Sequence, residues 1–361
     1  MKNLGYYETL DEFIKHTSGN INEFFLFVAE RTEFSISKLQ NSNIKFCGAI
    51  FPQVILNEET YESGIVSVEL DKETESFLIK DIENFELTKN DFNKDVDSIS
   101  IVIDGLSSKI TPFLESLFIS LPLDTEIIGG GAGKLTLKQE PVIFTNEGIF
   151  QDAAIILALT SNLYVGVENG WEYLEGPFIA TSTNKNIVHS LNFEKSFDIY
   201  KKIVEKDSGI KFTDDNFFEL AKSYPLGIIK FDKEIVVRDP IAKDEDGNII
   251  LVGDLEQNST VNILKGNKEN LISSSGTAAL KAVEKKASAC RSSCALEGVV
   301  LFDCISRSIF LEDRFKDELK EVKKHVPVQD VFGALTLGEI ANNGNEYINF
   351  YNKTCVLGIL C

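Results

Sequence analysis

The residues of this chain that could do chemistry together lie near its C-terminus, in VVLFDCISRSIF (Val299 to Phe310) and VFGALTLGEIA (Val331 to Ala341). Val299–Phe302 and Val331–Thr336 are short, apolar and rich in β-branched residues, which predicts two buried strands. Leu311–His325 between them repeats its apolar residues at helical spacing, which predicts a connecting helix. If the two strands are parallel, both end at one edge of the sheet, where such sheets commonly bind ligands.

That edge would bring Cys304, Arg307 and Glu339 together. An arginine can hold a carboxylate through paired N–H donors, and a carboxylate can accept an ammonium group. Arg238 and Asp239, in IVVRDPIA, offer the same combination. A charged zwitterion needs both partners, because either charge left bare in an apolar cleft would cost several kcal/mol, about 2–7 for a polar group without a hydrogen bond. These residues predict a site for an amino-acid-like or other small anionic metabolite.

Phosphate binding, thiol catalysis and metal binding each lack part of the residue pattern that they require. GGGAG (Gly129 to Gly133) fits neither the phosphate-binding nor the dinucleotide-binding spacing, so close packing is favoured, although the amides of Gly130 and Gly131 are candidates to line a ligand. No histidine is tied to Cys304 by a motif, so an enzyme of unknown type stays a second alternative. Cys290 and Cys294 lie one helical turn apart without a second ligand pair, which does not predict a metal site.

The composition of the chain also indicates which partners and which cellular compartment to expect. The 361 residues carry a formal net charge of −20, which disfavours binding to nucleic acid or anionic lipid. The N-terminus has no apolar signal-peptide core, and no apolar run approaches the roughly 20 residues of a membrane span. Six cysteines in a chain of this length indicate reduced thiols rather than a disulfide framework. We therefore expect a cytoplasmic protein with neither a nucleic-acid partner nor a membrane span.

The pattern of strands and helices along the whole chain predicts an α+β fold. It has mixed β-sheets built from β-α-β units and hairpins, helices on the outer faces, and two structurally related halves. Three strand–helix–strand units recur, each ending in glycine beside a small residue, in IKFCGAIF, EIIGGGAG and VFGAL. We expect Thr111 to cap the helix of the second unit, ahead of Pro112.

Two hairpins are also expected. AIILAL and NLYVGV flank a turn at Ser161–Asn162, and VVRDPIA and NIILVG flank the tight-turn sequence DEDG. Asn192–Glu205 is predicted to be an amphipathic helix with Phe193 on its apolar side, and Thr277–Leu296 a helix of small residues. The absence of a low-complexity linker predicts that the two halves share an extensive interface.

The segments CISR, GALTLGEIA and NFYNKTCVL, together with GVENGWEYLEGPFIATST (Gly166 to Thr183), resemble the FIST family of bacterial sensory domains. The resemblance implies an N-terminal lead-in (1–23), a FIST N-terminal domain (24–195) and a FIST C-terminal domain (196–357). The sequence departs from the family in that no kinase, cyclase, receptor or F-box segment is recognised, so we expect a FIST unit alone. It implies a sensory module that binds a small ligand, needs no cofactor and signals through a separate histidine kinase, cyclase or chemoreceptor. A haem-based nitric-oxide sensor is the alternative, with His189 as the haem ligand.

Overall fold

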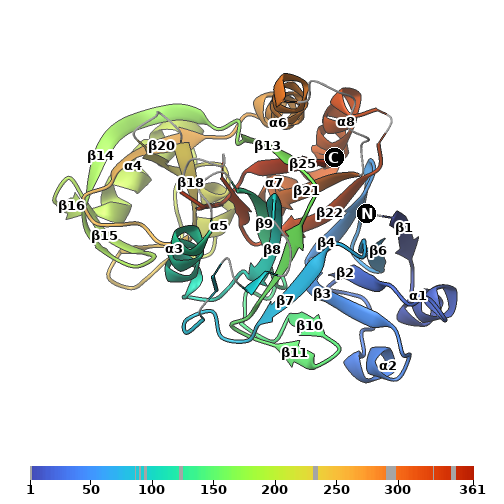
Figure 1. Ribbon diagram of the computed structural model, residues 1–361. Helices are drawn as coiled ribbons and strands as arrows, with labels where there is room; N and C mark the ends of the chain where they lie inside the picture. Colours follow the sequence, from blue (N-terminus) through green and yellow to red (C-terminus); the bar gives the residue numbers. More distant parts are fainter. Residues whose placement is uncertain are drawn as a thin grey trace.

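The computed structural model describes residues 2–85, 87–88, 91–92, 96–121, 125–230, 235–289, 298–327, 329–342 and 347–361. These residues form four β-sheets with helices on their outer faces (Figure 1). Three sheets mix parallel and antiparallel strands, and the fourth is antiparallel. The predicted α+β class is confirmed.

The first three sheets belong to three units with one plan. Each unit has a leading strand, two parallel strands joined by a helical crossover, a hairpin and a returning strand. Unit 1 consists of β1 (Lys2–Tyr7), α1 (Leu10–Thr17), β2 (Glu23–Ala29), α2 (Ile36–Gln40), β3 (Lys45–Phe51), β4 (Gln53–Leu56), β5 (Glu59–Tyr61) and β6 (Ile65–Glu69). Unit 2 consists of β7 (Glu75–Ile79), β8 (Ser98–Asp104), α3 (Ile110–Ser120), β9 (Glu126–Ala132), β10 (Ile143–Thr145), β11 (Gly148–Phe150) and β12 (Ala154–Leu159).

Unit 3 follows the same plan but is interrupted after its leading strand. It consists of β13 (Leu163–Glu168), α6 (Lys268–Ala289), β21 (Gly298–Cys304), α7 (Ile305–Leu311), the 3-10 turn η2 (Glu312–Arg314), α8 (Phe315–His325), β22 (Val331–Thr336), β23 (Glu339–Ala341), β24 (Asn349–Tyr351) and β25 (Cys355–Leu360). The interruption, called the insert domain here, consists of β14 (Glu172–Asn184), β15 (Ile187–Leu191), β16 (Glu194–Lys195), α4 (Ser196–Ser208), α5 (Phe217–Ala221), β17 (Leu226–Ile229), β18 (Ile235–Lys243), β19 (Ile249–Val252) and β20 (Thr260–Lys265).

The hairpins of the three units are exchanged in a cycle. The orders are β1-β6-β2-β3-β10-β11, β7-β12-β8-β9-β23-β24 and β13-β25-β21-β22-β4-β5. Unit 1 thus receives the hairpin of unit 2, unit 2 that of unit 3, and unit 3 that of unit 1. No unit can complete its own sheet, so the three form one body.

The predicted strand–helix–strand units are confirmed as parallel pairs, β2 with β3, β8 with β9 and β21 with β22. A glycine in the second strand of each pair allows the two parallel strands to lie close together. Gly48, Gly129 and Gly333 lie opposite the fourth residue of the neighbouring parallel strand in units 1, 2 and 3. An added Cβ would come within 1.8–2.2 Å of that residue's carbonyl oxygen. Only glycine fits at this place in all three units.

The three sheets meet in a shared apolar core. Phe27 of unit 1 lies with its ring centroid 6.1 Å from that of Phe302 and 6.2 Å from that of Phe332, both in unit 3. Ile128 of unit 2 faces the same centre, and all four side chains are buried. Edge-on and tilted aromatic contacts at these distances add to the free energy gained from apolar burial.

The insert domain is a sheet that closes on itself, because β14 pairs with both β20 and β15. Its β18–β19 hairpin confirms the strand pair predicted around DEDG. In Figure 1 the insert domain lies beside the three units, with α3 at the junction and α6 and α8 over the outer face of the unit 3 sheet.

The hairpin predicted from AIILAL and NLYVGV is wrong. β12 pairs with β7 and β8, whereas β13 pairs with β25 in another sheet. Ser161–Asn162 therefore connects two units and does not close a hairpin. Both strands are apolar, so their local pattern could not show which partner each would take.

Three helix boundaries also differ from expectation. α3 begins at Ile110, so Thr111 lies inside its first turn rather than at the cap. α4 begins at Ser196, because the preceding residues form the turn between β15 and β16, and Phe193 in that turn is 90% exposed. α6 begins at Lys268, and the predicted continuation through 290–296 lies outside the described residues.

Candidate functional site

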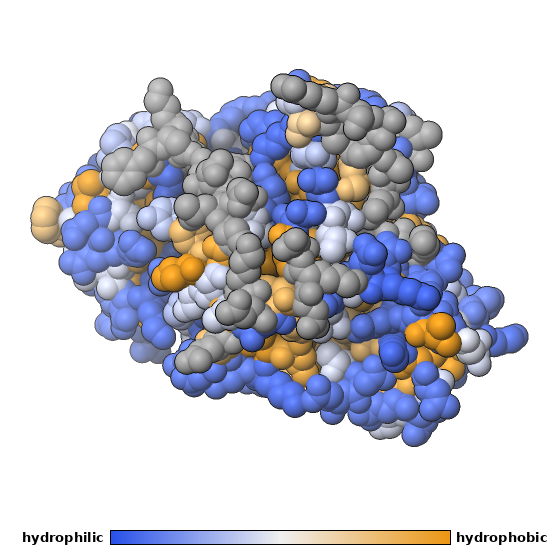
Figure 2. All heavy atoms as spheres, viewed as in Figure 1, coloured by the Kyte–Doolittle hydropathy of each residue, from blue (hydrophilic) through white to orange (hydrophobic). Residues whose placement is uncertain are grey.

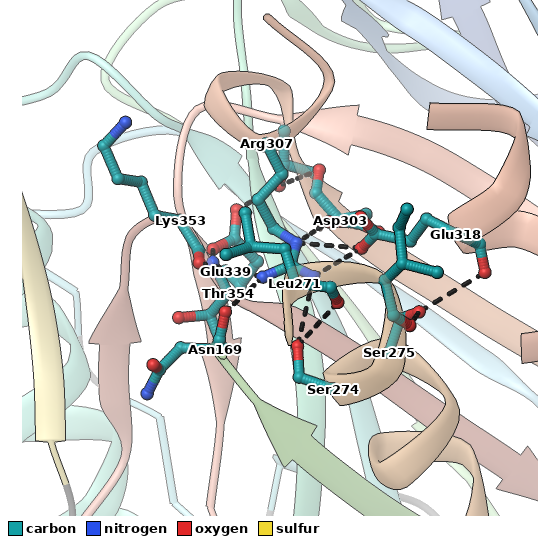
Figure 3. Close-up of polar contacts among 12 residues, drawn as sticks. Asn169, Leu271, Ser274, Ser275, Asp303, Arg307, Glu318, Glu339, Lys353 and Thr354 are labelled. Carbon is teal, nitrogen blue, oxygen red and sulfur yellow. Dashed lines mark hydrogen bonds and ion pairs between the residues drawn. The ribbon is translucent and has the colours of Figure 1, made fainter. Parts of the chain in front are cut away.

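Arg307, on α7, is the centre of a buried polar network at the carboxyl ends of β21 and β22 (Figure 3). Its side chain is fully buried. Nε and Nη2 donate to Glu318 Oε1 over 2.8 and 2.6 Å, and Nε lies 3.2 Å from Asp303 Oδ1. Nη2 also donates to the carbonyl of Leu271, and Nη1 to that of Asn169. All three guanidinium nitrogens of Arg307 therefore donate to oxygen atoms of the protein itself.

Asp303 and Glu318 place two carboxylates around that single cation. Asp303 lies in β21, and Glu318 lies on the face of α8 that also buries Phe315 and Leu319. Burial raises the pKa of Asp303, Glu318 raises it further, and the opposing effect of Arg307 does not cancel them. Burial likewise raises the pKa of Glu318. Burial alone would lower the pKa of Arg307, but the two carboxylates hold it above its ordinary value.

Glu339, the first residue of β23, has a fully buried carboxyl group. Thr336 Oγ1 donates to Glu339 Oε1 over 2.8 Å and lies 3.2 Å from the Asp303 carbonyl oxygen, its second acceptor. Burial raises the pKa of Glu339 to about 8, against hydrogen bonds from Thr336, Thr354 and Cys304. Because this pKa lies above neutral pH, most Glu339 side chains are protonated at pH 7.

Lys353 joins the network to the insert domain. It lies in the turn between β24 and β25 with φ 54°, and it is fully buried. Its Nζ is 3.1 Å from Asp239 Oδ2 on β18 and donates to the Lys222 carbonyl oxygen over 3.0 Å. Its own carbonyl oxygen accepts from Trp171 Nε1 and Arg307 Nη1. A bulky residue held in the left-handed region is strained and persists only where its surroundings fix it.

We call Asp239, Asp303, Arg307, Glu318, Glu339 and Lys353 the buried charge cluster. Cys304, Arg307 and Glu339, which the sequence placed at one edge of the sheet, lie close together, since Cys304 adjoins Glu339. Asp239 reaches the same cluster through Lys353, which the sequence did not predict. They lie in the interior and not at the rim of an open pocket: Arg307 and Glu339 have 0% exposure and Asp239 has 1%.

Arg238 lies apart from the cluster, in the wall of a pocket of about 330 Å³ between α3, the insert domain and residues 347–350. Its Nε donates to the Asp254 carbonyl oxygen over 2.8 Å, and its Nη1 to those of Val237 and Phe350. Among the described residues, nothing hydrogen-bonds to Nη2. Burial lowers the pKa of Arg238 to about 10, so it remains a cation at neutral pH.

This α3 pocket combines charges of both signs with an aromatic wall. Arg238 and Lys230 supply cations to the lining, and Glu115 and Glu256 supply carboxylates. The rings of Phe118 and Tyr347 lie 5.2 Å apart, centroid to centroid. Figure 2 shows mostly hydrophilic side chains on this face, with apolar side chains at the surface over α3. The volume and mixed lining suit a small polar metabolite.

The remaining sequence candidates lie elsewhere. Gly130 and Gly131 are in β9, where Gly131 N donates to the Gly338 carbonyl oxygen and an added Cβ on Gly130 would meet Thr336. Close packing, which the sequence already favoured, explains both. His189 lies half-buried in β15, so the haem alternative stays a prediction that an absorption spectrum would test. Cys290 and Cys294 lie outside the described residues.

Three residues of the buried charge cluster were not predicted from the sequence, namely Asp303, Glu318 and Lys353. One signal was available for Glu318, because it falls three residues after Phe315 in the apolar stripe of its helix. An acid in such a stripe needs a buried partner. Lys353 left no comparable signal, since its partners Asp239 and Lys222 are far away in the sequence.

The described residues form one α+β body of three related units and an insert domain. Family models for the FIST N domain and the FIST C domain match residues 25–194 and 196–342. The chain belongs to the FIST family, whose domains are sensory domains of signal transduction. The boundary between the two models falls inside the insert domain, between β16 and α4. A search of curated proteins finds no match.

No helix in the described part of the chain has both the length and the apolar character of a membrane span.

Proposed function

We propose that this chain is a cytoplasmic sensor of a small metabolite, which it binds in the α3 pocket. The observation that carries the proposal is the position of Arg238, a cation in the pocket wall whose Nη2 is not used by the described residues. A guanidinium held by three main-chain carbonyls is oriented before a ligand arrives, which lowers the entropic cost of binding. Its free donor fits a ligand carboxylate.

The other lining residues favour an amino-acid-like ligand. Glu115 and Glu256 can accept an ammonium group, whereas Asp239 is already neutralised by Lys353. Phe118 can cover an apolar side chain of the ligand. The other anionic metabolites considered from the sequence would use Arg238 and Lys230 without the acids.

Binding at Arg238 has a direct route to the buried charge cluster. Arg238 and Asp239 are neighbours in β18, and successive side chains of a strand point to opposite faces. Arg238 holds the Phe350 carbonyl oxygen of β24, and Asp239 holds Lys353 three residues further along. A ligand that shifts Arg238 would therefore move the segment from Phe350 to Lys353 and, with it, the buried charge cluster. The resulting change at the protein surface would act on a separate histidine kinase, cyclase or chemoreceptor.

The test is ligand binding by the full-length chain. A panel of amino acids and small carboxylates is screened by thermal shift, and hits are measured by calorimetry. Arg238→Lys should weaken binding of a hit about tenfold, because lysine cannot reproduce the planar donor fork. Arg314→Lys, which changes an exposed arginine outside the pocket, is the matched control and should bind as wild type does. Equal affinity for all three proteins would remove Arg238 from the site.

A further inference from the structure

The buried charge cluster around Arg307 contains more acidic groups than basic groups. The cluster contains four carboxyl groups and two cations, and each of these side chains is at most 2% exposed. With every group ionised, the cluster would have a net charge of −2. Buried charge that is not balanced costs several kcal/mol per ion, so additional positive charge must reside there, as protons or as a metal ion.

The unbalanced charge is concentrated at Asp303 and Glu318. Glu318 Oε2 and both carboxylate oxygens of Asp303 are buried and have no hydrogen-bond partner. Glu318 uses its other oxygen for Arg307. Asp303 Oδ1 has an ion-pair contact with Arg307 Nε at 3.2 Å. A buried acceptor without a hydrogen bond costs about 1–3 kcal/mol, so these three oxygens favour a bound proton or cation.

A sulfur atom completes the group. Cys355 is the residue of β25 directly opposite Asp303 in the antiparallel pair, so both side chains project from the same face of the sheet. Its thiol is free and buried. One ligand atom each from Asp303, Glu318 and Cys355 lie within 4.8 Å of one another, a spacing that could hold a metal ion.

We propose that Asp303, Glu318 and Cys355 form a binding site for one thiophilic divalent cation of the zinc class. Two carboxylates and a thiolate are the donor types that such a cation accepts. Together with Arg307 they would balance its charge to zero. Binding would displace the thiol proton of Cys355 and the protons that the carboxyl groups otherwise hold. Arg307 would position both carboxylates from the opposite side.

Cobalt binding tests the proposal on the full-length chain. Chelator-treated protein is titrated with Co²⁺, and absorption from thiolate-to-cobalt charge transfer is recorded. We expect one equivalent per chain in wild type, loss of the band in Cys355→Ser, and at least tenfold weaker binding in Glu318→Gln. Metal analysis of protein purified without chelator should find zinc.

Two variants separate this site from the other thiols. Cys47→Ser removes a buried thiol in unit 1, and the double variant Cys290→Ser/Cys294→Ser removes the pair outside the described residues. Both should keep the cobalt band. No band in wild type would overturn the proposal and leave protons as the balancing charge, as would a band that Cys290→Ser/Cys294→Ser abolishes. The wild-type titration is decisive even if Cys355→Ser fails to fold.

Discussion

The ammonium group of Lys353 lies 3.1 Å from Asp239 Oδ2, and this ion pair joins a unit 3 turn to the insert domain within the protein interior. Removing one partner of a buried pair leaves the other charge without compensation. Lys353→Met should therefore lower the free energy of unfolding by about 3–5 kcal/mol, measured by urea denaturation. Lys38→Met, which breaks the exposed pair with Asp11, should cost at most about 1 kcal/mol. Equal effects of the two substitutions would contradict the assignment.

The pH dependence of stability should report the protonation of Glu339. Its pKa is raised from 4.5 to about 8, so the folded state keeps a proton that the unfolded state loses. This stabilisation is complete below about pH 4.5 and is lost as the pH rises through about 8. Each unit of raised pKa corresponds to about 1.4 kcal/mol.

Glu339→Gln imitates the protonated carboxyl group and should remove this part of the pH dependence. Urea denaturation between about pH 5 and 9 should show that the variant gains on wild type as the pH rises. Glu245→Gln, at an exposed position, should follow the wild-type curve. Parallel curves for wild type and Glu339→Gln would show that Glu339 is ionised throughout.

Gly129→Ala should be severely destabilising. The added Cβ would lie 1.9 Å from the carbonyl oxygen of Ile101, so the parallel pair of unit 2 must separate. We expect loss of cooperative unfolding in calorimetry. At Gly209, where the space is open and φ is 71°, alanine should cost only about 1–2 kcal/mol of backbone strain. A variant at Gly129 with a normal melting transition would show that the strands tolerate the shift.

The two family regions should not fold separately. A fragment of residues 192–361 loses the strands that pair with β20, β22, β23 and β25, which are β14, β4, β9 and β13. It should aggregate or give poorly dispersed NMR spectra. Co-expression with residues 1–191 should restore a soluble complex. A cooperative melt of the isolated fragment would mean that the shared sheets contribute little to its stability.

Local features were predictable from the sequence. The three crossovers were visible because each has an apolar strand, a helix and a strand with glycine beside a small residue. The exchange of hairpins was not visible, because the pairing of β22 with β4 joins residues far apart in the chain. The same limit applied to the site: Arg307 and Glu339 follow neighbouring strands, whereas Lys353 reaches Asp239 only in the folded protein.

The cyclic hairpin exchange gives three units of one chain the arrangement that three identical subunits with exchanged hairpins would have in a closed trimer. Ala29, Asp104 and Cys304 stand at the same place, the seventh residue of the first crossover strand in each unit. In a trimer of identical chains, any substitution there would appear three times. A single chain is free of that constraint, so unit 3 can carry the charge cluster and the insert domain while units 1 and 2 supply the strands that complete the fold.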